Sequence, residues 1–567
     1  MMNKLRLPLT AIVAGLLLTG CDSRPPAAEA DAIYLNGSVL TMTEPPEAEA
    51  LAVKEGLILA VGDKASILRH KGANTKTFDL HGKTLMPGFF QTHAHFPFIA
   101  MKNQLVNIDP PPEGDVDSMD KLIAKLRPVA QATPAGLPVF AIGYDDTLLA
   151  EKRHPTKQDL DRISTEHPVF LIHISFHFVT MNSVALAKIG VDAQTQDPPG
   201  GVIRRIPGTQ EPDGVFEEAA MMYLEGLLPT PTPQQLFDGY VKTMHDLAAK
   251  GYTTVVDHAS TADVEKAYAA LSDMGKMPLD LIAYHRLADP RQPAAEISRT
   301  YQGRYRTGGY KIVLDGSIQG FTGYLSQPYH SHTPHHDHDY RGYPHLNEEV
   351  FTNLVQRAYA ENAPLLVHTN GDAATDLYIK AVRKASGTYP EADVRPVIIH
   401  AQTMREDQLD AAAELGMLPS FFVDHVYFWG DRHRDIFLGP DRAARISPAA
   451  SALDRNMRFT LHDDAPVVSA DPMRSAWAAV NRRTSSGSTL GPDQRIPAAD
   501  ALKALTLDAA YQQFEDTTKG SLEAGKRADM IILDENPLTM DPENIRSLKV
   551  LETIKDGETV FKISSGG

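Results

Sequence analysis

The central part of the chain alternates short apolar runs with stretches of helical periodicity. This alternation predicts βα units and a parallel sheet. Eight such runs are present, which is the number of strands that closes a parallel barrel. The expected strands are residues 84–91, leading into His93, and residues 252–257, 279–284, 310–314, 364–367, 396–399, 416–420 and 458–461. We therefore expect an α/β protein whose main domain is a (β/α)₈ TIM barrel, formed by residues 85–100 and 246–519.

The two ends of the chain have a different pattern, with short strand-like runs separated by turn residues such as Asn36-Gly37. These runs are residues 32–35, 38–42, 50–53, 57–62, 529–533 and 550–554. Strand-rich ends around a long central region predict a small β-sandwich domain built jointly from residues 31–84 and 520–567.

Residues 101–245 separate the first barrel strand from the second, a distance far longer than a usual βα loop. This stretch has strand-like runs at 139–142 and 169–172 and helical patterns near 118–130 and 214–250. Because the loops that follow barrel strands lie at the active-site face, we expect an inserted subdomain over that face.

Composition narrows the class of partner. Apolar residues make up 43% and charged residues 22% of the chain, as in ordinary globular proteins. The formal net charge is −17 and no run of Lys and Arg occurs, which argues against a nucleic-acid partner. An acidic protein also repels anions at long range, so neutral or cationic small-molecule substrates are favoured.

The first residues resemble a lipoprotein signal peptide. Lys4 and Arg6 precede an apolar stretch at 7–18, which is too short to span a membrane as a mature helix. The sequence Leu18-Thr19-Gly20-Cys21 follows and resembles a lipobox. We expect cleavage of a signal over residues 1–21, lipidation of Cys21, and a tether at 22–30 that holds the protein on the bacterial cell envelope, facing the periplasm or the outside. The alternative is an ordinary secretory signal in which the single cysteine falls there by chance.

Polar residues occur where the expected barrel strands end, the place where such barrels carry their chemistry. Alternation along the first strand places His93 and His95 on the same side. A single histidine at a strand end is usually a hydrogen-bonded core residue, but a set of imidazoles and carboxylates at one mouth suits zinc or a similar divalent ion. The set is His93, His95, Lys311, His368, His400 and the run His462-Asp463-Asp464.

These motifs resemble the amidohydrolase superfamily, and within it the branch of N-substituted formamide deformylases and relatives of D-aminoacylase. The resemblance covers essentially the whole mature chain. It is carried by residues 86–95, 251–257, 311–316, 400–402, 464–466 and 520–529. The chain departs from the usual pattern at 368–372 and 173–177, which bears on the identity of the substrate.

The resemblance implies a metal-dependent hydrolase that cleaves a carbon–nitrogen bond of a small molecule, in an amide, formamide or N-acyl group. It implies two divalent metal ions, best matched by zinc, although one ion would also fit. Lys311 would be carboxylated by CO₂ and bridge them; unmodified, it would pair with Asp315 or a substrate carboxylate. The implied ligands are His93, His95, Lys311, His368, His400 and Asp464.

Asp464 would act as the general acid and base, because Ala465-Pro466 follows it as in the family, and Asp463 would lie behind it. The expected substrate contacts are His177, Asp315, Asp372 and Tyr144, with Asp145 as a further contact of the lid. The histidine-rich run at 330–339 is expected to be a solvated loop or an adventitious metal site.

Two other readings stay open at this point. A deaminase would keep the fold, but deaminases of the superfamily usually hold one metal and lack the lysine of strand four. A non-catalytic binding or regulatory lipoprotein would be expected to have lost ligands. The sequence leaves the oligomeric state open.

Overall fold

The computed structural model describes residues 28–224, 232–331 and 338–564. Cys21 and most of the expected tether lie outside these ranges. The same is true of His332, His335 and His336 in the histidine-rich run. Among the described residues, no helix combines the length and the apolar character needed to cross a bilayer.

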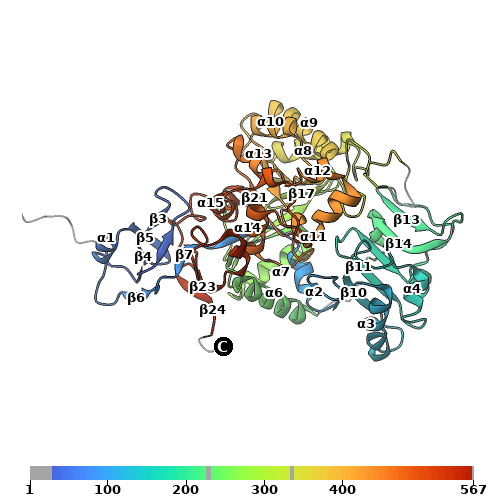
Figure 1. The fold of residues 1–567 in the computed structure, drawn as a ribbon, viewed down its shortest axis with the longest axis horizontal. Helices are drawn as coiled ribbons and strands as arrows, with labels where there is room; N and C mark the ends of the chain where they lie inside the picture. Colours follow the sequence, from blue (N-terminus) through green and yellow to red (C-terminus); the bar gives the residue numbers. More distant parts are fainter. Residues whose placement is uncertain (1–27, 225–231, 332–337, 565–567) are drawn as a thin grey trace, which may run out of the picture.

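Eight parallel strands form the centre of the molecule (Figure 1). Their order in the sheet follows the chain, and a parallel bridge between Ala94 and Ala465 brings the first strand beside the end of the last. The His95 N–H donates to Ala465 O at 2.8 Å across the same junction. The strands are β8 (Phe89–Ala94), β15 (Tyr252–Ser260), β16 (Asp280–Arg286), β17 (Tyr305–Val313), β18 (Leu365–Thr369), β19 (Val397–His400), β20 (Leu418–Phe421) and β21 (Thr460–Leu461). The predicted TIM-like barrel of eight parallel strands is confirmed, and it is nearly closed.

Helices surround this barrel and cover its outer face. The connection from β16 to β17, residues 287–304, contains no helix. The covering helices are α6 (Pro233–Ala248), α7 (Ala262–Asp273), α8 (Glu348–Ala360), α9 (Asp372–Thr388), α10 (Glu406–Glu414), α13 (Ala449–Asp454), α14 (Pro472–Asn481) and α15 (Ala498–Ala504). Helices α11 (His425–Arg432) and α16 (Leu507–Gln512) contribute to other hydrophobic clusters, α11 with Ile174 and α16 with Phe90. Short helices α2 (Phe96–Lys102) and α12 (Pro440–Ala443) follow β8 and α11.

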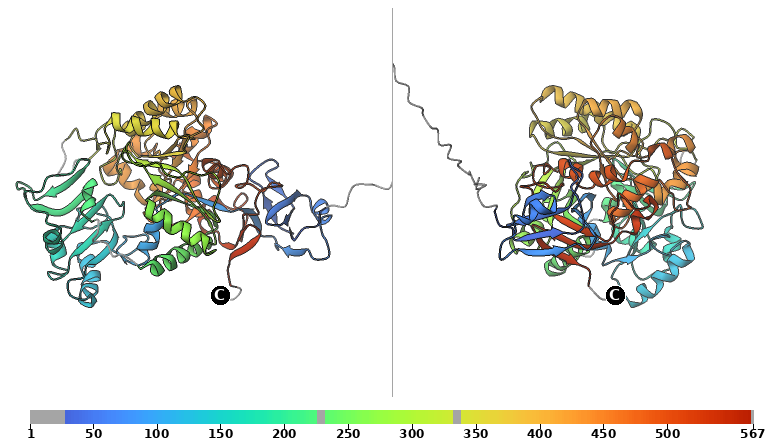
Figure 2. Two further views of the ribbon diagram at one scale, coloured as in Figure 1. Left: turned by 180° about the vertical axis from the view of Figure 1, so that it is seen from behind. Right: turned by 60° about the vertical axis from the view of Figure 1, so that its left-hand side comes forward.

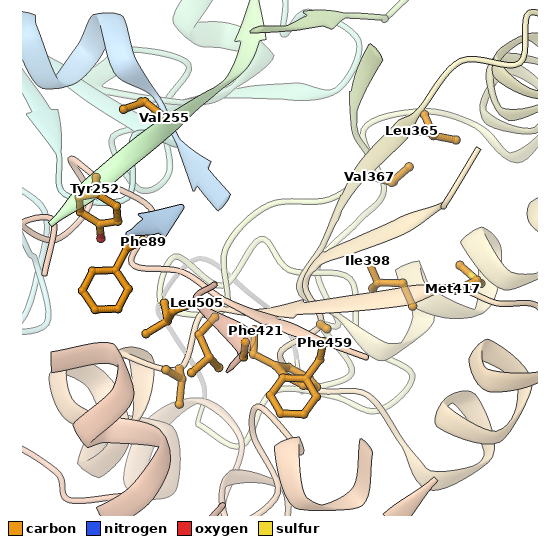
Figure 3. Packing of buried hydrophobic residues seen from close by; sticks show 14 of the residues in the cluster. Phe89, Tyr252, Val255, Leu365, Val367, Ile398, Met417, Phe421, Phe459 and Leu505 are labelled. Atoms are coloured by element: carbon orange, nitrogen blue, oxygen red, sulfur yellow. The ribbon is translucent and has the colours of Figure 1, made fainter. Parts of the chain in front are cut away.

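The core consists of two layers because side chains alternate along each barrel strand. Leu365 and Val367 of β18 face the outer layer with the helices, whereas Leu366 belongs to a separate cluster that fills the barrel. Figure 3 shows the outer layer from close by, where the rings of Phe421 and Phe459 lie 5.6 Å apart. Aromatic and branched side chains packed on both faces account for the uniformly apolar pattern of these strands.

The two ends of the chain form two further sheets. One has the order β24-β23-β22-β7-β2-β3, so strands from both ends share it, and the other has the order β5-β4-β1-β6. The strands are β1 (Ala32–Leu35), β2 (Ser38–Leu40), β3 (Glu47–Ala48), β4 (Ala50–Lys54), β5 (Leu57–Gly62), β6 (Lys76–Asp79), β7 (Thr84–Pro87), β22 (Met530–Leu533), β23 (Val550–Lys555) and β24 (Glu558–Lys562). Helix α1 (Lys64–Leu68) packs against β4 and β5.

The prediction of one strand over 84–91 is wrong. Residues Thr84–Pro87 pair with β22 and β2 outside the barrel, and the barrel strand begins at Phe89. Gly88 lies between the two, where a Cβ atom would come within 2.3 Å of Thr253 Cγ2. The chain passes from one sheet to the next at a position that only glycine fits.

Residues 106–218 contain a six-stranded sheet of order β13-β14-β12-β11-β10-β9. It lies on the opposite side of the barrel from the sheets of the two ends (Figures 1 and 2). Its elements are β9 (Val106–Asn107), α3 (Met119–Ala132), β10 (Val139–Tyr144), α4 (Lys157–Asp161), β11 (Val169–His173), β12 (Phe178–Met181), α5 (Ser183–Ile189), β13 (Gly201–Arg205) and β14 (Pro212–Glu218).

The helix expected near 214–250 is only partly correct. Residues Pro212–Glu218 form β14, residues Ala219–Leu224 form a 3₁₀ helix, and α6 begins at Pro233. Strand β14 is buried along its whole length and pairs with β12 on one side and β13 on the other. Its first residues, Pro212, Asp213 and Gly214, are poor helix formers, and pairing on two sides fixes the segment as a strand.

Candidate metal centre

Imidazoles from several strands meet where the barrel strands end. The ring centroid of His93 lies 5.4 Å from that of His95, 5.1 Å from that of His400 and 4.8 Å from that of His462. The rings of His368 and His400 are 4.4 Å apart. Parallel strands bring their carboxyl ends to one edge, which explains why residues so distant in sequence converge.

His258 and His462 also belong to this group, although His258 was not a candidate and His462 was not among the ligands that the resemblance implies. The Nδ1 atom of His258 is in direct contact with His93 Nδ1, and His462 Nε2 lies 3.2 Å from His400 Nδ1. Strand β15 continues through His258 with a register irregularity before Ser260. The sequence signal was present: His258 directly follows the motif at 251–257, and His462 opens the run that contains Asp464.

The Asp464 carboxylate contacts two of the imidazoles. Its Oδ1 atom lies 2.8 Å from His93 Nε2 and 3.5 Å from His95 Nε2. Burial raises the pKa of the Asp464 carboxyl well above its ordinary value, while the charge of Lys311 opposes this rise. The backbone of Asp464 has a positive φ of 55°, which turns this residue out of the regular strand.

The neighbouring carboxylate of Asp463 has different partners from that of Asp464. It accepts hydrogen bonds from Gln91 Nε2 at 2.7 Å, from Tyr252 Oη at 3.0 Å and from the Asp471 N–H at 2.9 Å. These bonds join β8, β15 and the start of α14. Asp463 thus has a structural environment, and Asp464 is the carboxylate that faces the imidazoles.

Lys311 extends from β17 and is only 1% exposed. Its Nζ atom makes no hydrogen bond with any described residue. Burial lowers the pKa of Lys311 to about 7, although the charge of Asp464 acts in the opposite direction. A substantial fraction of this side chain is therefore a neutral amine at neutral pH.

Asp315 positions the ring of His368 through its Nδ1 atom. Its Oδ1 atom lies 3.1 Å from His368 Nδ1 and accepts the Asn370 N–H at 3.0 Å, and its Oδ2 atom accepts the Gly371 N–H at 2.8 Å. Asp315 thus engages Nδ1 of His368, and Nε2 lies 3.3 Å from Asn370 Nδ2 on the other side of the ring. The structure places Asp315 as a support for this ring.

Of the other expected substrate contacts, one comes close to the imidazoles and two do not. His177 comes close to the group, with its ring centroid 5.6 Å from that of His368. Tyr144 is fully buried in the insertion, where its hydroxyl lies 3.1 Å from His154 Nδ1 and 3.0 Å from Thr180 Oγ1. Asp372 begins α9 and pairs with Arg405 at 3.1 Å. Neither Tyr144 nor Asp372 is brought to the imidazoles.

Two overlapping sets of these side chains offer ligand atoms within 4.8 Å of one another. They are His93, His400 and His462, and His93, His95 and Asp464. Burial lowers the pKa of His95 to about 3 and that of His368 to about 4, so these rings are neutral, as metal ligands must be. The buried atoms Lys311 Nζ and His258 Nε2 lack hydrogen-bond partners among the described residues. Unpaired buried polar atoms and this donor set both fit a bound cation.

A third set of this kind, Asp145, Asp146 and His173, lies in the insertion. Asp145 is already paired with Arg432 at 2.7 Å and accepts the Trp429 Nε1–H at 2.9 Å. Asp146 lies 3.2 Å from His173 Nε2 and 3.5 Å from His154 Nε2. These contacts account for both carboxylates without a metal.

Comparison with known proteins agrees with this arrangement. Residues 76–561 match the amidohydrolase family. The chain is 28% identical to the N-substituted formamide deformylase of Arthrobacter pascens, over 93% of this chain and 97% of that protein. It is 25% identical to the putative amidohydrolase YtcJ of Bacillus subtilis, over 94% and 100% of the two chains.

Solved structures give the same picture of the fold. An uncharacterized metal-dependent hydrolase from Pyrococcus horikoshii superposes with a TM-score of 0.70 at 23% identity, covering 90% of this chain and 99% of that one. A similar hydrolase from Pyrococcus furiosus gives 0.67 at 25% identity, covering 90% and 100%. With its nearly closed barrel, its cluster of imidazoles and carboxylate at one mouth, and a family match over most of its length, the chain belongs to the amidohydrolase family.

Proposed function

We propose that this protein is a metal-dependent hydrolase that cleaves the carbon–nitrogen bond of an amide, formamide or N-acyl group in a small molecule. The observation that carries the proposal is the convergence of His93, His95, Lys311 and Asp464 at one barrel mouth. The name of the Arthrobacter pascens relative supports the choice of bond.

The metal would be held by His93, His95, His368, His400, Asp464 and a carboxylated Lys311. A free ammonium cannot bind a cation. The lowered pKa of Lys311 leaves a neutral amine, whose lone pair forms a bond with the carbon of CO₂ while a proton is released. The resulting carbamate carries two oxygens, so it suits two divalent ions, and the imidazole-rich donor set suits zinc.

The chain's own groups then account for the proton transfers. Bound divalent ions lower the pKa of a water molecule and polarise a carbonyl group. Asp464 lies beside the two imidazoles of β8, which places its carboxylate to accept a proton from that water. The same carboxyl group would deliver the proton to the leaving nitrogen, so no covalent bond between enzyme and substrate is required.

The direct test combines metal analysis with a panel of N-formyl and N-acyl amines, and detects both products by mass spectrometry. We expect about two equivalents of divalent metal per chain, hydrolysis of at least one panel member, and loss of activity on chelation that added zinc restores. A metal-loaded protein that cleaves no carbon–nitrogen bond would contradict the proposal, as would full activity after complete removal of the metal.

We also propose that the mature protein is anchored to the cell envelope by lipid on Cys21. The support is the apolar stretch before Leu18-Thr19-Gly20-Cys21 and the position of the single cysteine. Cys21→Ser should abolish the incorporation of labelled fatty acid and leave the signal uncleaved. Labelling that persists in this variant would show that the segment is not a lipobox.

A further inference from the structure

A buried carboxylate contacts the Nδ1 atom of His177. Glu218 ends β14, and its Oε2 atom lies 2.7 Å from His177 Nδ1 and 3.1 Å from His345 Nε2. The Glu218 side chain is 3% exposed, whereas that of His177 is 17% exposed. Glu218 therefore lies within the protein, and His177 is the more exposed member of the pair.

Glu218 is held firmly in this place. Its N–H donates to His177 O at 2.9 Å, so backbone and side chain both fix the turn between β11 and β12. Its φ of 51° is unusual for a residue with a side chain, and surrounding contacts must maintain it. A Cβ atom on Gly316 would come within 2.3 Å of Glu218 Oε1, so the carboxylate also packs against the loop that follows β17.

The contact with His345 extends this support to the barrel. The His345 N–H donates to Leu314 O at 2.8 Å, just beyond the strand that carries Lys311. Glu218 thus fixes His177 relative to β17 as well as within the insertion. The ring of His177 reaches His368, whose own position is set by Asp315 from the same strand extension.

This arrangement leaves one polar atom of His177 available. Nδ1 is engaged by Glu218, and Nε2 makes no hydrogen bond with any described residue. In an ion pair with Glu218, Nε2 carries a hydrogen that can be donated to an oxygen. A donor at the edge of a candidate metal centre is suited to an acyl oxygen, on which negative charge develops when an amide is attacked.

We propose that Glu218 is a positioning residue, which holds His177 so that Nε2 binds the acyl oxygen of the substrate and of the carboxylate product. The inference rests on the proposed function. The competing explanation is that Glu218 only fastens the insertion to the barrel. The two explanations differ in whether the effect of Glu218 passes through His177.

The experiment is a double-mutant cycle in the metal-loaded, full-length protein, with Glu218→Gln, His177→Ala and the two combined. The matched control is Glu217→Gln, since Glu217 is the buried neighbour on β14 that pairs with Arg204 instead. For each variant we would measure metal content, thermal unfolding, kcat and KM on an amide from the panel, and the affinity for acetate as a product analogue.

We expect Glu218→Gln and His177→Ala each to lower kcat/KM and acetate affinity by about 10- to 100-fold, the range found for groups that orient catalytic residues. Metal content should stay at the wild-type level, and the double variant should be no weaker than His177→Ala alone. If the two effects multiply, if Glu217→Gln loses as much, or if Glu218→Gln keeps full kcat/KM, the positioning role is wrong.

Acetate binding separates this inference from the proposed function. If the wild-type protein binds acetate but cleaves no amide, the proposed function fails and the cycle is read from acetate affinity alone. Wild-type protein that does not bind acetate would contradict the role of His177. If Glu218→Gln does not fold, Glu218→Asp replaces it: the shorter carboxylate keeps the charge and should show a smaller loss of acetate affinity, and an unchanged affinity would overturn the inference.

Discussion

At the scale of the residue, Lys311 shows how burial changes what a side chain can do. Its Nζ atom is buried without a hydrogen-bond partner among the described residues. The pKa of the amine is lowered to about 7, which is far below that of a solvated lysine. A neutral amine does not form an ion pair, but it can react with CO₂. This property leads to the first prediction.

Lys311→Ala should remove the proposed carbamate and lower kcat by about 100-fold or more, as loss of a metal-bridging group does. Short carboxylic acids such as acetate or propionate, added to the variant, should restore part of the activity because their oxygens can occupy the vacated space. Activity is measured with and without the acid and with bicarbonate as a control. Full activity of Lys311→Ala without any added acid would rule out the bridging role.

Asp464→Asn should separate chemistry from metal binding. The amide keeps an oxygen that can still bind a metal, but it cannot carry the proton, so turnover should fall by about 10²- to 10⁴-fold while most of the metal remains. Metal content and kcat are measured on the same preparation.

The matched control is Asp463→Asn, at the neighbouring carboxylate that bonds Gln91 and Tyr252. This change should lower the melting temperature and leave kcat of the folded fraction near the wild-type value. If Asp463→Asn abolished turnover and Asp464→Asn did not, the assignment of the two carboxylates would have to be reversed.

Sequence patterns at this scale identify residues that end a strand, and fail for residues that support them. His93, His95, Lys311, His368 and His400 were named because they occur at the ends of apolar runs. His258 was missed because the run was ended at Asp257, one residue too early, and His462 because Asp464 two residues later was the expected ligand. Glu218 gave no signal, since its role depends on contacts with segments about 40 and 127 residues away in the chain.

At the scale of the element, the barrel strands were predictable because burial on both faces makes them continuously apolar. What the sequence did not show was where one sheet ends and another begins. Residues 84–91 were predicted to form one strand, and the change of sheet at Gly88 depends on its close approach to Thr253 of a different strand. Only Glu217 and Glu218 of strand β14 favour helices, and its pairing with β12 and β13 makes the whole segment a strand.

A buried ion cluster joins elements at the other end of the barrel strands. Asp280, at the start of β16, lies 2.7 Å from Lys519 Nζ and 2.8 Å from Lys555 Nζ, which connects the barrel to β23. Burial alone would raise the pKa of Asp280, but the two lysines hold it below its ordinary value. The stability that this carboxylate contributes is therefore complete above about pH 4 and is lost as the pH falls further.

Asp280→Asn should lower the free energy of unfolding by about 3 kcal/mol at neutral pH, because it leaves two buried ammonium groups short of negative charge. Urea unfolding measures the loss. The difference from wild type should shrink on acidification, since the wild-type carboxylate is then protonated as well. The exposed pair of Asp289 and Arg291 supplies the control, and Asp289→Asn should leave the free energy of unfolding nearly unchanged. Equal losses in the two variants would contradict this account of the cluster.

At the scale of the whole molecule, the insertion and the sheets of the two ends lie on opposite sides of the barrel (Figure 2). The insertion is on the side of the mouth, because Phe176 stacks on Phe98 at 5.5 Å and His177 contacts His368. Phe98 follows His95 at the start of α2, and their ring centroids lie 6.0 Å apart. Insertion and barrel therefore both place side chains next to the candidate metal centre, and we expect their relative position to affect substrate binding.

Asp145 is a main point of attachment between these two parts. It belongs to the insertion, yet its carboxylate accepts the Trp429 Nε1–H at 2.9 Å and pairs with Arg432 at 2.7 Å, both on α11.

Asp145→Asn should leave the Arg432 guanidinium without its carboxylate partner and loosen the insertion on the barrel. We expect faster hydrogen exchange in the turn between β11 and β12, a rise in KM of about tenfold, equivalent to about 1.4 kcal/mol of binding, and unchanged metal content. Asp146→Asn is the matched control because the contacts of Asp146 with His154 and His173 both lie within the insertion, so its effect on KM should be small. If hydrogen exchange and KM in Asp145→Asn match the wild type, the insertion is held in place by other contacts and Asp145 does not govern its position over the mouth.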